Sequence, residues 1–508
     1  MNKYVDNNGV EHTYKDGLQT TDPVTVTQIK VNPEMSHEVN TSIHKILYRC
    51  NAYETAQAFK KLNTGLARFW SSVPSHGRQV RKMRNDLYAV TIDTFADIVI
   101  SGLNKPVFKD PADEKLFDEI FTDKNNLDFW KLARRFLVNA LITGDANSKI
   151  SVDTELSQYP IVEIYDAENT EYKYKRGFLT DNIFYSYFTE KEQDYELREI
   201  YGKGFIAYEL YKDGKKVRLT DTEMTSNLPE KWEFSKDDLF NMATLLIIWD
   251  SPKYKGRGKP LFDTKIDELD ALDEVDSQWL DALRAGRVNR YIPKDLIPKD
   301  PEDGSLMRPN FFDNDFIELE GSLNEGSDKI QILQPDIKYD AFLQSYVAAL
   351  DRCLLGIISP STLGIDARKL DDNATAQRER ERITSWKRAQ IIDAFSPVLA
   401  ALVEKVLKVY AIMNNQTPHD VEVEILFDEY NSPNIEQKLE IVAKGIPGQQ
   451  IIPWSKAVEI VFDDLTPEEQ KAIAEELERL NNPTISEPEM FPVDIDKIDE
   501  EETEEIEE

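Results

Sequence analysis

The spacing of apolar and polar residues predicts helices in most of the chain and strands in one long region. Helical periodicity covers residues 33–63, 78–102 and 126–144. Residues 148–220 instead carry short aromatic and β-branched runs between turn signals, a pattern typical of strands. Among them, Asp213-Gly214 lies between two such runs and predicts a β-hairpin. The mixture predicts an α+β fold.

Two further helices, separated by an insert, are predicted in the second half of the chain. The first should run from about 261 to 285 and the second from about 338 to 358. The insert, 288–335, is rich in proline and glycine and should contain two or three short strands. Antiparallel pairing of the two helices would carry this insert away from the main body as a protruding lobe.

The first of these helices has an acidic face that contains no base. At 100° per residue its carboxylates fall within a stripe about 80° wide. Like charges at this spacing cost a few tenths of a kcal/mol per pair, so helix stability alone does not favour the stripe. One interpretation is an ordinary solvated face, and the other is an acidic wall that faces something it must not bind. The stripe consists of Asp263, Asp267, Asp270, Glu274 and Asp281.

The second helix is apolar on nearly every side and should be buried over most of its surface. Two environments fit this pattern: the core of one subunit, or a contact between neighbouring subunits. Under the second interpretation, Phe342, Tyr346 and Leu350 would pack between subunits.

A loop with two adjacent bases, Arg368 and Lys369, follows the second helix. A long helical pattern then continues to about Met413. It opens with an arginine-rich run, 377–382, which is typical of a helix with i,i+3 and i,i+4 ion pairs. Pro397 lies inside its apolar pattern and should kink or restart the helix.

Composition limits the classes of partner. The chain has 61 basic and 94 acidic residues and a net charge of −33. A protein that wraps DNA should show a basic footprint, so this chain is expected to touch DNA only locally or to let it pass.

No run reaches the ~18 apolar residues of a membrane span, and no membrane partner is expected. Two distant cysteines, Cys50 and Cys353, do not form a disulfide framework.

No catalytic or metal-binding motif is present in the sequence. Gly256-Arg257-Gly258-Lys259-Pro260 lacks the first glycine and the Ser/Thr of a phosphate loop. The five histidines show no metal-ligand spacing, and there is no nucleophile elbow. We therefore expect no catalytic residue, no metal and no cofactor. A metal-dependent nuclease is the enzyme alternative, and it would need carboxylates that converge on one pocket.

The order of these elements resembles that of the portal proteins of tailed bacteriophages, from about residue 50 to 480. Leu355–Gly364, followed by Asn373-Ala374-Thr375-Ala376, is similar to the family's passage from stem to tunnel loop to long helix. Leu141–Ala146 before a strand resembles the family's wing core, and Gly448–Ile452 resembles its crown.

The resemblance implies a portal fold with a mixed α/β wing, a two-helix stem, a small β-rich clip, a long kinked helix and a helical crown. The implied segments are an N-terminal arm (1–32), the wing (33–255), stem helix 1 (256–287), the clip (288–335), stem helix 2 (336–358), a tunnel loop (359–373), the long kinked helix (374–420), the crown (421–482) and an acidic disordered tail (483–508).

The resemblance also implies a function. Such proteins form a ring, typically a dodecamer, at one capsid vertex, through which double-stranded DNA is packaged and ejected. The implied partners are copies of the chain, the DNA, the terminase large subunit, the major capsid and scaffold proteins, and head-completion or tail adaptor proteins. The implied location is the virion, and the host cytoplasm during assembly.

Within that ring the acidic stripe would line the channel, and Arg368 and Lys369 would lie on the loop nearest the DNA. The alternative is another head–tail adaptor or morphogenesis protein, which would lack the helix–insert–helix plan.

Overall fold

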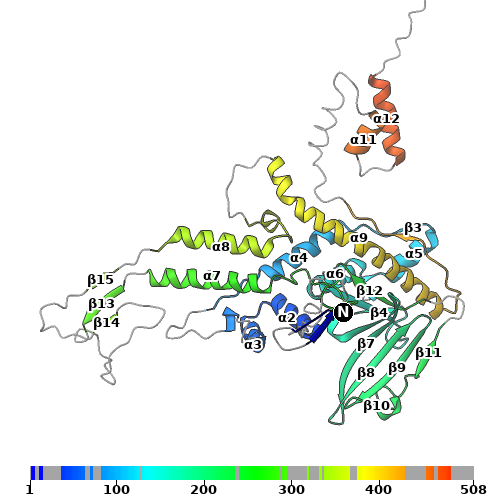
Figure 1. The fold of residues 1–508 in the computed structure, drawn as a ribbon. Coiled ribbons are helices and arrows are strands. Elements are labelled where there is room, and N and C mark those ends of the chain that lie inside the picture. The colour runs from blue at the N-terminus through cyan, green and yellow to red at the C-terminus, as the bar shows by residue number, and fades with distance from the viewer. Residues whose placement is uncertain are drawn as a thin grey trace, which may run out of the picture. The chain divides into compact units, whose positions relative to one another are not determined.

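The computed structural model describes residues 2–5, 11–14, 36–62, 69–72, 82–125, 127–234, 240–286, 289–293, 317–319, 331–333, 337–365, 374–428, 453–462 and 467–481. The chain divides into two compact units, Met1–Asp428 and Glu429–Glu508. The predicted α+β fold is confirmed (Figure 1). The predicted acidic tail, the two loop bases Arg368 and Lys369, and the crown-like segment Gly448–Ile452 lie outside the described residues.

The helices of the first unit follow the apolar periodicity of the sequence. They are α2 His37–Arg49, α3 Ala52–Leu62, α4 Leu87–Ile100, α5 Pro111–Ile120, α6 Phe129–Thr143, α7 Ile266–Ala285, α8 Tyr339–Leu354 and α9 Ala374–Met413. Short 3-10 helices are η1 Trp70–Ser72, η2 Asp123–Asn125, η3 Ala167–Asn169, η4 Leu219–Asp221 and η6 Pro360–Leu363. Side-chain caps fix several helix starts. Ser36 accepts from the N–H of Val39 at the start of α2, for example.

The strands of the first unit are mostly antiparallel neighbours in sequence. The largest sheet has the order β10 Lys215–Val217, β9 Phe205–Lys212, β8 Gln193–Gly202, β7 Phe178–Glu190 and β6 Thr170–Lys175, with β11 Lys231–Glu233 paired to β9. A second sheet has the order β12 Ala243–Ile247, β4 Asp145–Ser151 and β5 Ile161–Tyr165. Two short pairs are β1 Asn2–Val5 with β2 Glu11–Tyr14, and β16 Val423–Glu424 with β3 Val107–Phe108.

The hairpin predicted at Asp213-Gly214 is confirmed. These two residues connect β9 to β10, and both have positive φ, at 48° and 74°. A two-residue turn with positive φ at both positions matches the twist of the flanking strands, which is why Asn or Asp followed by Gly is favoured there.

One continuous hydrophobic core joins the helices and the second sheet. Helix α9 packs on β12, the edge strand of that sheet (Figure 1). Phe136 of α6 and Phe395 of α9 are fully buried, and their ring centroids lie 6.4 Å apart. Pro397 lies inside α9, so the helix is continuous through the proline and is not restarted there. The core therefore depends on one long helix that runs past the edge strand.

In the segment predicted as the N-terminal arm, 1–32, β1 and β2 pair as an antiparallel hairpin. Two local predictions differ from the structure. The helix expected from 78 begins only at Leu87. Residues 421–428, which were assigned to the crown, belong to the first unit, because Val423 and Glu424 pair with β3.

The second unit contains two described helices, α11 Trp454–Val461 and α12 Pro467–Asn481, which pack on each other. Pro467 is the first residue of α12, a position where proline is favoured because its missing N–H would have no partner within the helix.

Candidate functional site

Helices α7 and α8 form an antiparallel pair, the arrangement that would carry the insert away from the main body (Figure 1). The ring of Trp279 lies 6.2 Å from that of Tyr339 and 6.1 Å from that of Tyr346, between centroids. At the opposite end of the pair, the Lys265 ammonium donates to the carbonyl of Arg352 at 2.6 Å.

The two ends of the insert, at the end of α7 and just before α8, lie next to each other. Gly286 ends α7 so close to Ile337 that a Cβ on the glycine would lie 2.3 Å from the isoleucine side chain. Three short strands are described within the insert. They are β13 Asn289–Pro293, β14 Ile317–Leu319 and β15 Gln331–Leu333, in the order β14-β13-β15. We call the end of the pair near Lys265 and Leu354 the root, and the part formed by Gln278–Ala285 and Tyr339–Ala348 the outer part.

The predicted acidic wall is wrong for two of its five residues. Asp263 precedes α7, is only 4% exposed and accepts from the Lys253 ammonium at 2.8 Å. Asp270 is 6% exposed and is engaged by backbone N–H groups of its own chain. By contrast, Asp267 is exposed, and Glu274 and Asp281 are half-buried. Of the stripe, only these three carboxylates are accessible to a ligand in the isolated chain.

The buried carboxylates of α7 hold a distant segment of the chain. Asp270 accepts from the N–H of Trp70 at 2.6 Å and from the N–H of Ser71 at 3.1 Å. Asp273 accepts from the guanidinium of Arg84 at 2.5 Å and from the N–H of Asn85 at 2.8 Å. Each carboxylate thus satisfies backbone donors that no helix or sheet supplies with a partner. We call residues 69–72 and 82–85 the strap.

The strap also explains why the helix predicted from residue 78 begins later. The N–H of Met83 donates to the hydroxyl of Ser277 on α7, at 2.9 Å. With the N–H of Asn85 also bound to α7, residues 82–86 run without helical structure until α4 begins at Leu87. The sequence carried no signal for this contact, because Ser277 and Asp273 lie outside the acidic stripe and almost 200 residues from Met83 and Arg84.

Burial raises the pKa values of three carboxyl groups of α7 that lie at or near the strap. Desolvation raises the pKa of Asp273 to about 6, against the opposing attraction of Arg84. The pKa values of Glu274 and Asp276 are also raised, chiefly by burial. The side chains of Arg84 and Asp273 are 8% and 2% exposed, so this ion pair is shielded from solvent.

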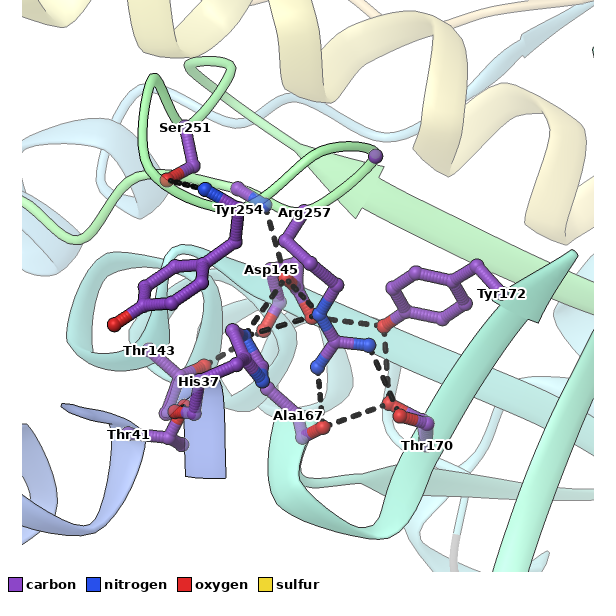
Figure 2. A network of polar contacts seen from close by, with 12 residues as sticks. His37, Thr41, Thr143, Asp145, Ala167, Thr170, Tyr172, Ser251, Tyr254 and Arg257 are labelled. Carbon is purple, nitrogen blue, oxygen red and sulfur yellow. Dashed lines mark hydrogen bonds and ion pairs between the residues drawn. The ribbon is translucent and has the colours of Figure 1, made fainter. Parts of the chain in front are cut away.

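A second buried network anchors the loop that leads into α7 (Figure 2). The guanidinium of Arg257 lies 3.2 Å from the fully buried carboxylate of Asp145, and it donates to the carbonyl of Thr170 at 2.9 Å and to that of Ala167. Asp145 also accepts from Tyr172 at 2.8 Å and from the N–H of Gly258 at 2.9 Å. We call this network the anchor. It joins β4, η3, β6 and the loop before α7.

Two glycines allow the loop before α7 to pass close to the start of β4. Gly144 has φ +95°, and a Cβ on Gly258 would lie 1.8 Å from the carbonyl oxygen of Gly144. The segment 256–260, which the sequence excluded as a phosphate loop, therefore has a structural role. Sequence analysis missed that role because the acceptors of Arg257 lie 87 to 112 residues earlier in the chain.

His37 packs against the anchor and is kept uncharged by it. Its Nε2 lies 3.0 Å from Nε of Arg257. Burial, and secondly the charge of Arg257, lower the pKa of His37 to about 4. Burial also raises the pKa of Asp145, opposed by Arg257 and by the hydrogen bonds from Gly258 and Tyr172.

Helix α8 is buried only at the root. Ala349, Leu350, Cys353 and Leu354 are buried in the core of the chain itself, whereas no residue of Tyr339–Ala348 is buried. The prediction that Leu350 packs between subunits is therefore wrong, because its own chain leaves it only 2% exposed. Phe342 and Tyr346 are half-buried and keep apolar surface that the chain does not cover.

Hydrogen bonds that involve hydroxyl groups hold the segment after α8 against α9. The Thr384 hydroxyl on α9 accepts from the N–H of Ser359 at 3.0 Å and lies 3.1 Å from the hydroxyl of Thr362. Gly364 ends η6 with φ +70°. Ser359, Thr362 and Gly364 belong to the predicted tunnel loop, 359–373, of which the structure describes 359–365.

The part of the chain that the structure describes offers neither a metal centre nor a membrane span. No group of three or more His, Cys, Asp or Glu side chains that could hold a metal ion occurs among these residues. None of the described helices is long and apolar enough to span a bilayer. A scan of protein-family models and a search of curated proteins each found no match for this chain.

Proposed function

We propose that this chain is a portal protein of a tailed bacteriophage, which assembles into a ring at one capsid vertex and lets double-stranded DNA in and out. The observation that carries the proposal is the antiparallel α7–α8 pair with a small β insert at its outer end. The pair is followed by η6 and by the long helix α9. This order corresponds to the stem, clip, tunnel loop and long helix of that family, with α11 and α12 as the crown.

Uncovered apolar surface supports a ring of subunits. In the outer part, Tyr339 is 56% exposed and Leu283 is 46% exposed, beside the half-buried Phe342 and Tyr346. A neighbouring copy that covers this surface would remove it from water at about 25 cal/mol per Å². Contacts of this kind that repeat head to tail close into a ring.

The charge of the chain fits a passage that does not hold DNA. With a net charge of −33, the subunit as a whole repels phosphates. Asp267, Glu274 and Asp281 are the carboxylates of the stripe that remain accessible, and we propose that they contribute to the channel wall. Arg368 and Lys369 are proposed to contact the DNA locally and transiently. The motor that hydrolyses ATP would be the terminase, docked on the insert.

Electron microscopy of the purified full chain tests this proposal. The expected result is a closed ring with a central hole, and light scattering at micromolar concentration should give the corresponding mass. A monodisperse monomer in both measurements would overturn the portal assignment.

The channel wall has its own test. Replacing Asp267, Glu274 and Asp281 with Lys should leave the ring assembled but slow DNA packaging, because a basic wall binds phosphates through counterion release. The charge-conserving changes Asp267→Glu, Glu274→Asp and Asp281→Glu are the matched control and should package normally. A ring structure in which all three side chains point outward would refute the wall without refuting the ring.

A further inference from the structure

A cavity between α9 and the two sheets has the chemistry of a ligand site. Its volume is 470 Å³, and a volume of a few hundred Å³ is typical of small-ligand pockets. Residues of β12 and α9 line the cavity. Strand β12 is the edge strand of its sheet and runs beside α9 (Figure 1).

The walls of this cavity are mainly apolar. Leu245 and Ile247 alternate along β12 and therefore lie on the same face of the strand. Val398 and Ala401 of α9 form the opposite wall, and Leu179 of β7 adds to it. These side chains suit an aliphatic group.

One end of the cavity carries a positive charge. The ammonium of Lys405 donates to the carbonyl of Ala243 at 2.6 Å and to the hydroxyl of Thr244 at 3.1 Å. An ammonium has three donors, so one remains for a ligand. Burial lowers the pKa of Lys405 to about 8, which leaves the group mostly protonated at neutral pH.

Lys405 has no carboxylate partner among the residues the structure describes. The adjacent Glu404 pairs instead with Lys408, at 3.0 Å. Burial lowers the pKa of Lys405 and the charge of Glu404 opposes this only in part, so an anion that bound the ammonium directly would reduce the cost of burying it.

A second donor belongs to the same cavity. Asn182 is fully buried and its Nδ2 has no hydrogen-bond partner, while its Oδ1 accepts from Asn241 at 3.1 Å. Asn241 in turn accepts from the N–H of Ala243, the residue whose carbonyl binds Lys405. These hydrogen bonds connect the unpartnered amide with the ammonium through the backbone of Ala243, and Asn182 and Lys405 are both lining residues of the cavity.

We propose that this cavity binds a carboxylate group with an apolar body, whose oxygens accept from Lys405 and Asn182 while its aliphatic part packs on Leu245, Ile247 and Val398. Two sources offer this chemistry: a free aliphatic acid, or a glutamate side chain between apolar residues in a partner polypeptide. The inference does not depend on ring assembly.

Calorimetric titration of the full chain separates the two sources. The probes are octanoate against octanamide, and acetyl-Leu-Glu-Leu-amide against acetyl-Leu-Gln-Leu-amide. We expect one carboxylate probe to bind about tenfold or more tightly than its amide, since each 1.4 kcal/mol is a factor of ten. Preference for octanoate identifies a free acid, and preference for the glutamate peptide alone identifies a polypeptide. Equal binding of acid and amide in both pairs overturns the proposal.

Variants connect the binding to the cavity. Lys405→Met should abolish the preference for the carboxylate, and Lys387→Met on the same helix, outside the cavity, should leave it unchanged. Raising the pH from 7 to about 9 should weaken carboxylate binding in the wild type, because Lys405 loses its proton across its pKa of about 8.

A filling variant covers the case in which Lys405→Met does not fold. Ala401→Phe should block the cavity without removing a charge, and a melting curve monitors the fold of each variant. Undiminished carboxylate preference in folded Lys405→Met or in folded Ala401→Phe would place the binding elsewhere and refute the inference.

Discussion

The root and the outer part of the α7–α8 pair differ in how completely a single chain pairs its polar groups and buries its apolar side chains. At the root, Asp270 and Asp273 bind the strap, and Leu350 and Leu354 are buried in the core. In the outer part no residue of Tyr339–Ala348 is buried, although α8 carries apolar residues along both halves. One helix thus has two environments, and its sequence alone does not distinguish them.

This difference fits the proposed ring, in which a subunit would fold alone and still require neighbours to assemble. The root has buried charges that are paired within the chain, so it depends less on a partner subunit. The outer part has aromatic surface in the same helix but no cover for it, which is the surface that a neighbouring subunit would remove from water. Stability should therefore be most sensitive at the root and its anchor, and assembly most sensitive in the outer part.

The largest effect is expected at the anchor that holds the root to the sheets. Arg257→Met should destabilise the fold by about 3–5 kcal/mol, because it leaves the buried Asp145 without its counter-charge. Chemical denaturation measures this as a lower midpoint. Lys255→Met, two residues earlier and exposed, is the control and should stay within about 0.5 kcal/mol of the wild type. Equal midpoints for the two variants would show that the anchor does not stabilise the fold.

The next comparison lies within α8 itself. Leu350→Ala should cost about 2–5 kcal/mol, as for other buried leucines. Phe342→Ala should change the stability of the subunit by less, since the side chain is only half-buried, but it should weaken the ring. Denaturation and light scattering on both variants separate the two effects. If Phe342→Ala unfolds the subunit as strongly as Leu350→Ala, the root and the outer part are not distinct.

Local patterns predicted local structure well. The Asp213-Gly214 turn and the existence of α7, α8 and α9 follow from turn chemistry and residue periodicity, although α9 is not restarted at Pro397. Each of these features depends on contacts within an element or between neighbours in the sequence. The residues that form such features are visible in the sequence.

Contacts between distant segments could not be predicted in the same way. Asp270 shares the helical spacing of the exposed Asp267, yet its partners, Trp70 and Ser71, lie about 200 residues earlier. A carboxylate that accepts backbone N–H groups has the same sequence signature as one in solvent. The partners of Arg257 include backbone carbonyls, which carry no sequence signature at all.

A matched pair on α7 tests this distinction. Asp270→Asn should destabilise the fold by about 1–3 kcal/mol, because the strap loses a charged acceptor for buried donors. Asp267→Asn, one helical turn earlier and exposed, should change the free energy of unfolding by no more than about 0.5 kcal/mol. Limited proteolysis at the strap should accelerate only in Asp270→Asn. Equal behaviour of the two variants would mean that the strap contact is not formed.

The smallest expected change in stability at neutral pH comes from two groups whose pKa values burial shifts in opposite directions. Their effects on the pH dependence of stability should therefore have opposite signs. His37 titrates at a pKa of about 4 in the folded chain against 6.5 when exposed, so its contribution to stability is complete above 6.5 and is lost as the pH falls toward 4. Asp273 titrates at a pKa of about 6 against 3.8, so the folded chain gains stability from it as the pH falls from 6 toward 3.8.

His37→Gln should therefore make the loss of stability in acid shallower, and Asp273→Asn should make it steeper. Each change corresponds to at most about a tenfold difference in the unfolding constant per pH unit, since one proton is involved. Urea midpoints at intervals between about pH 4 and 7 measure both slopes against the wild type. If the two substitutions change the slope in the same direction, the anchor and the strap do not bury their ionisable groups as described.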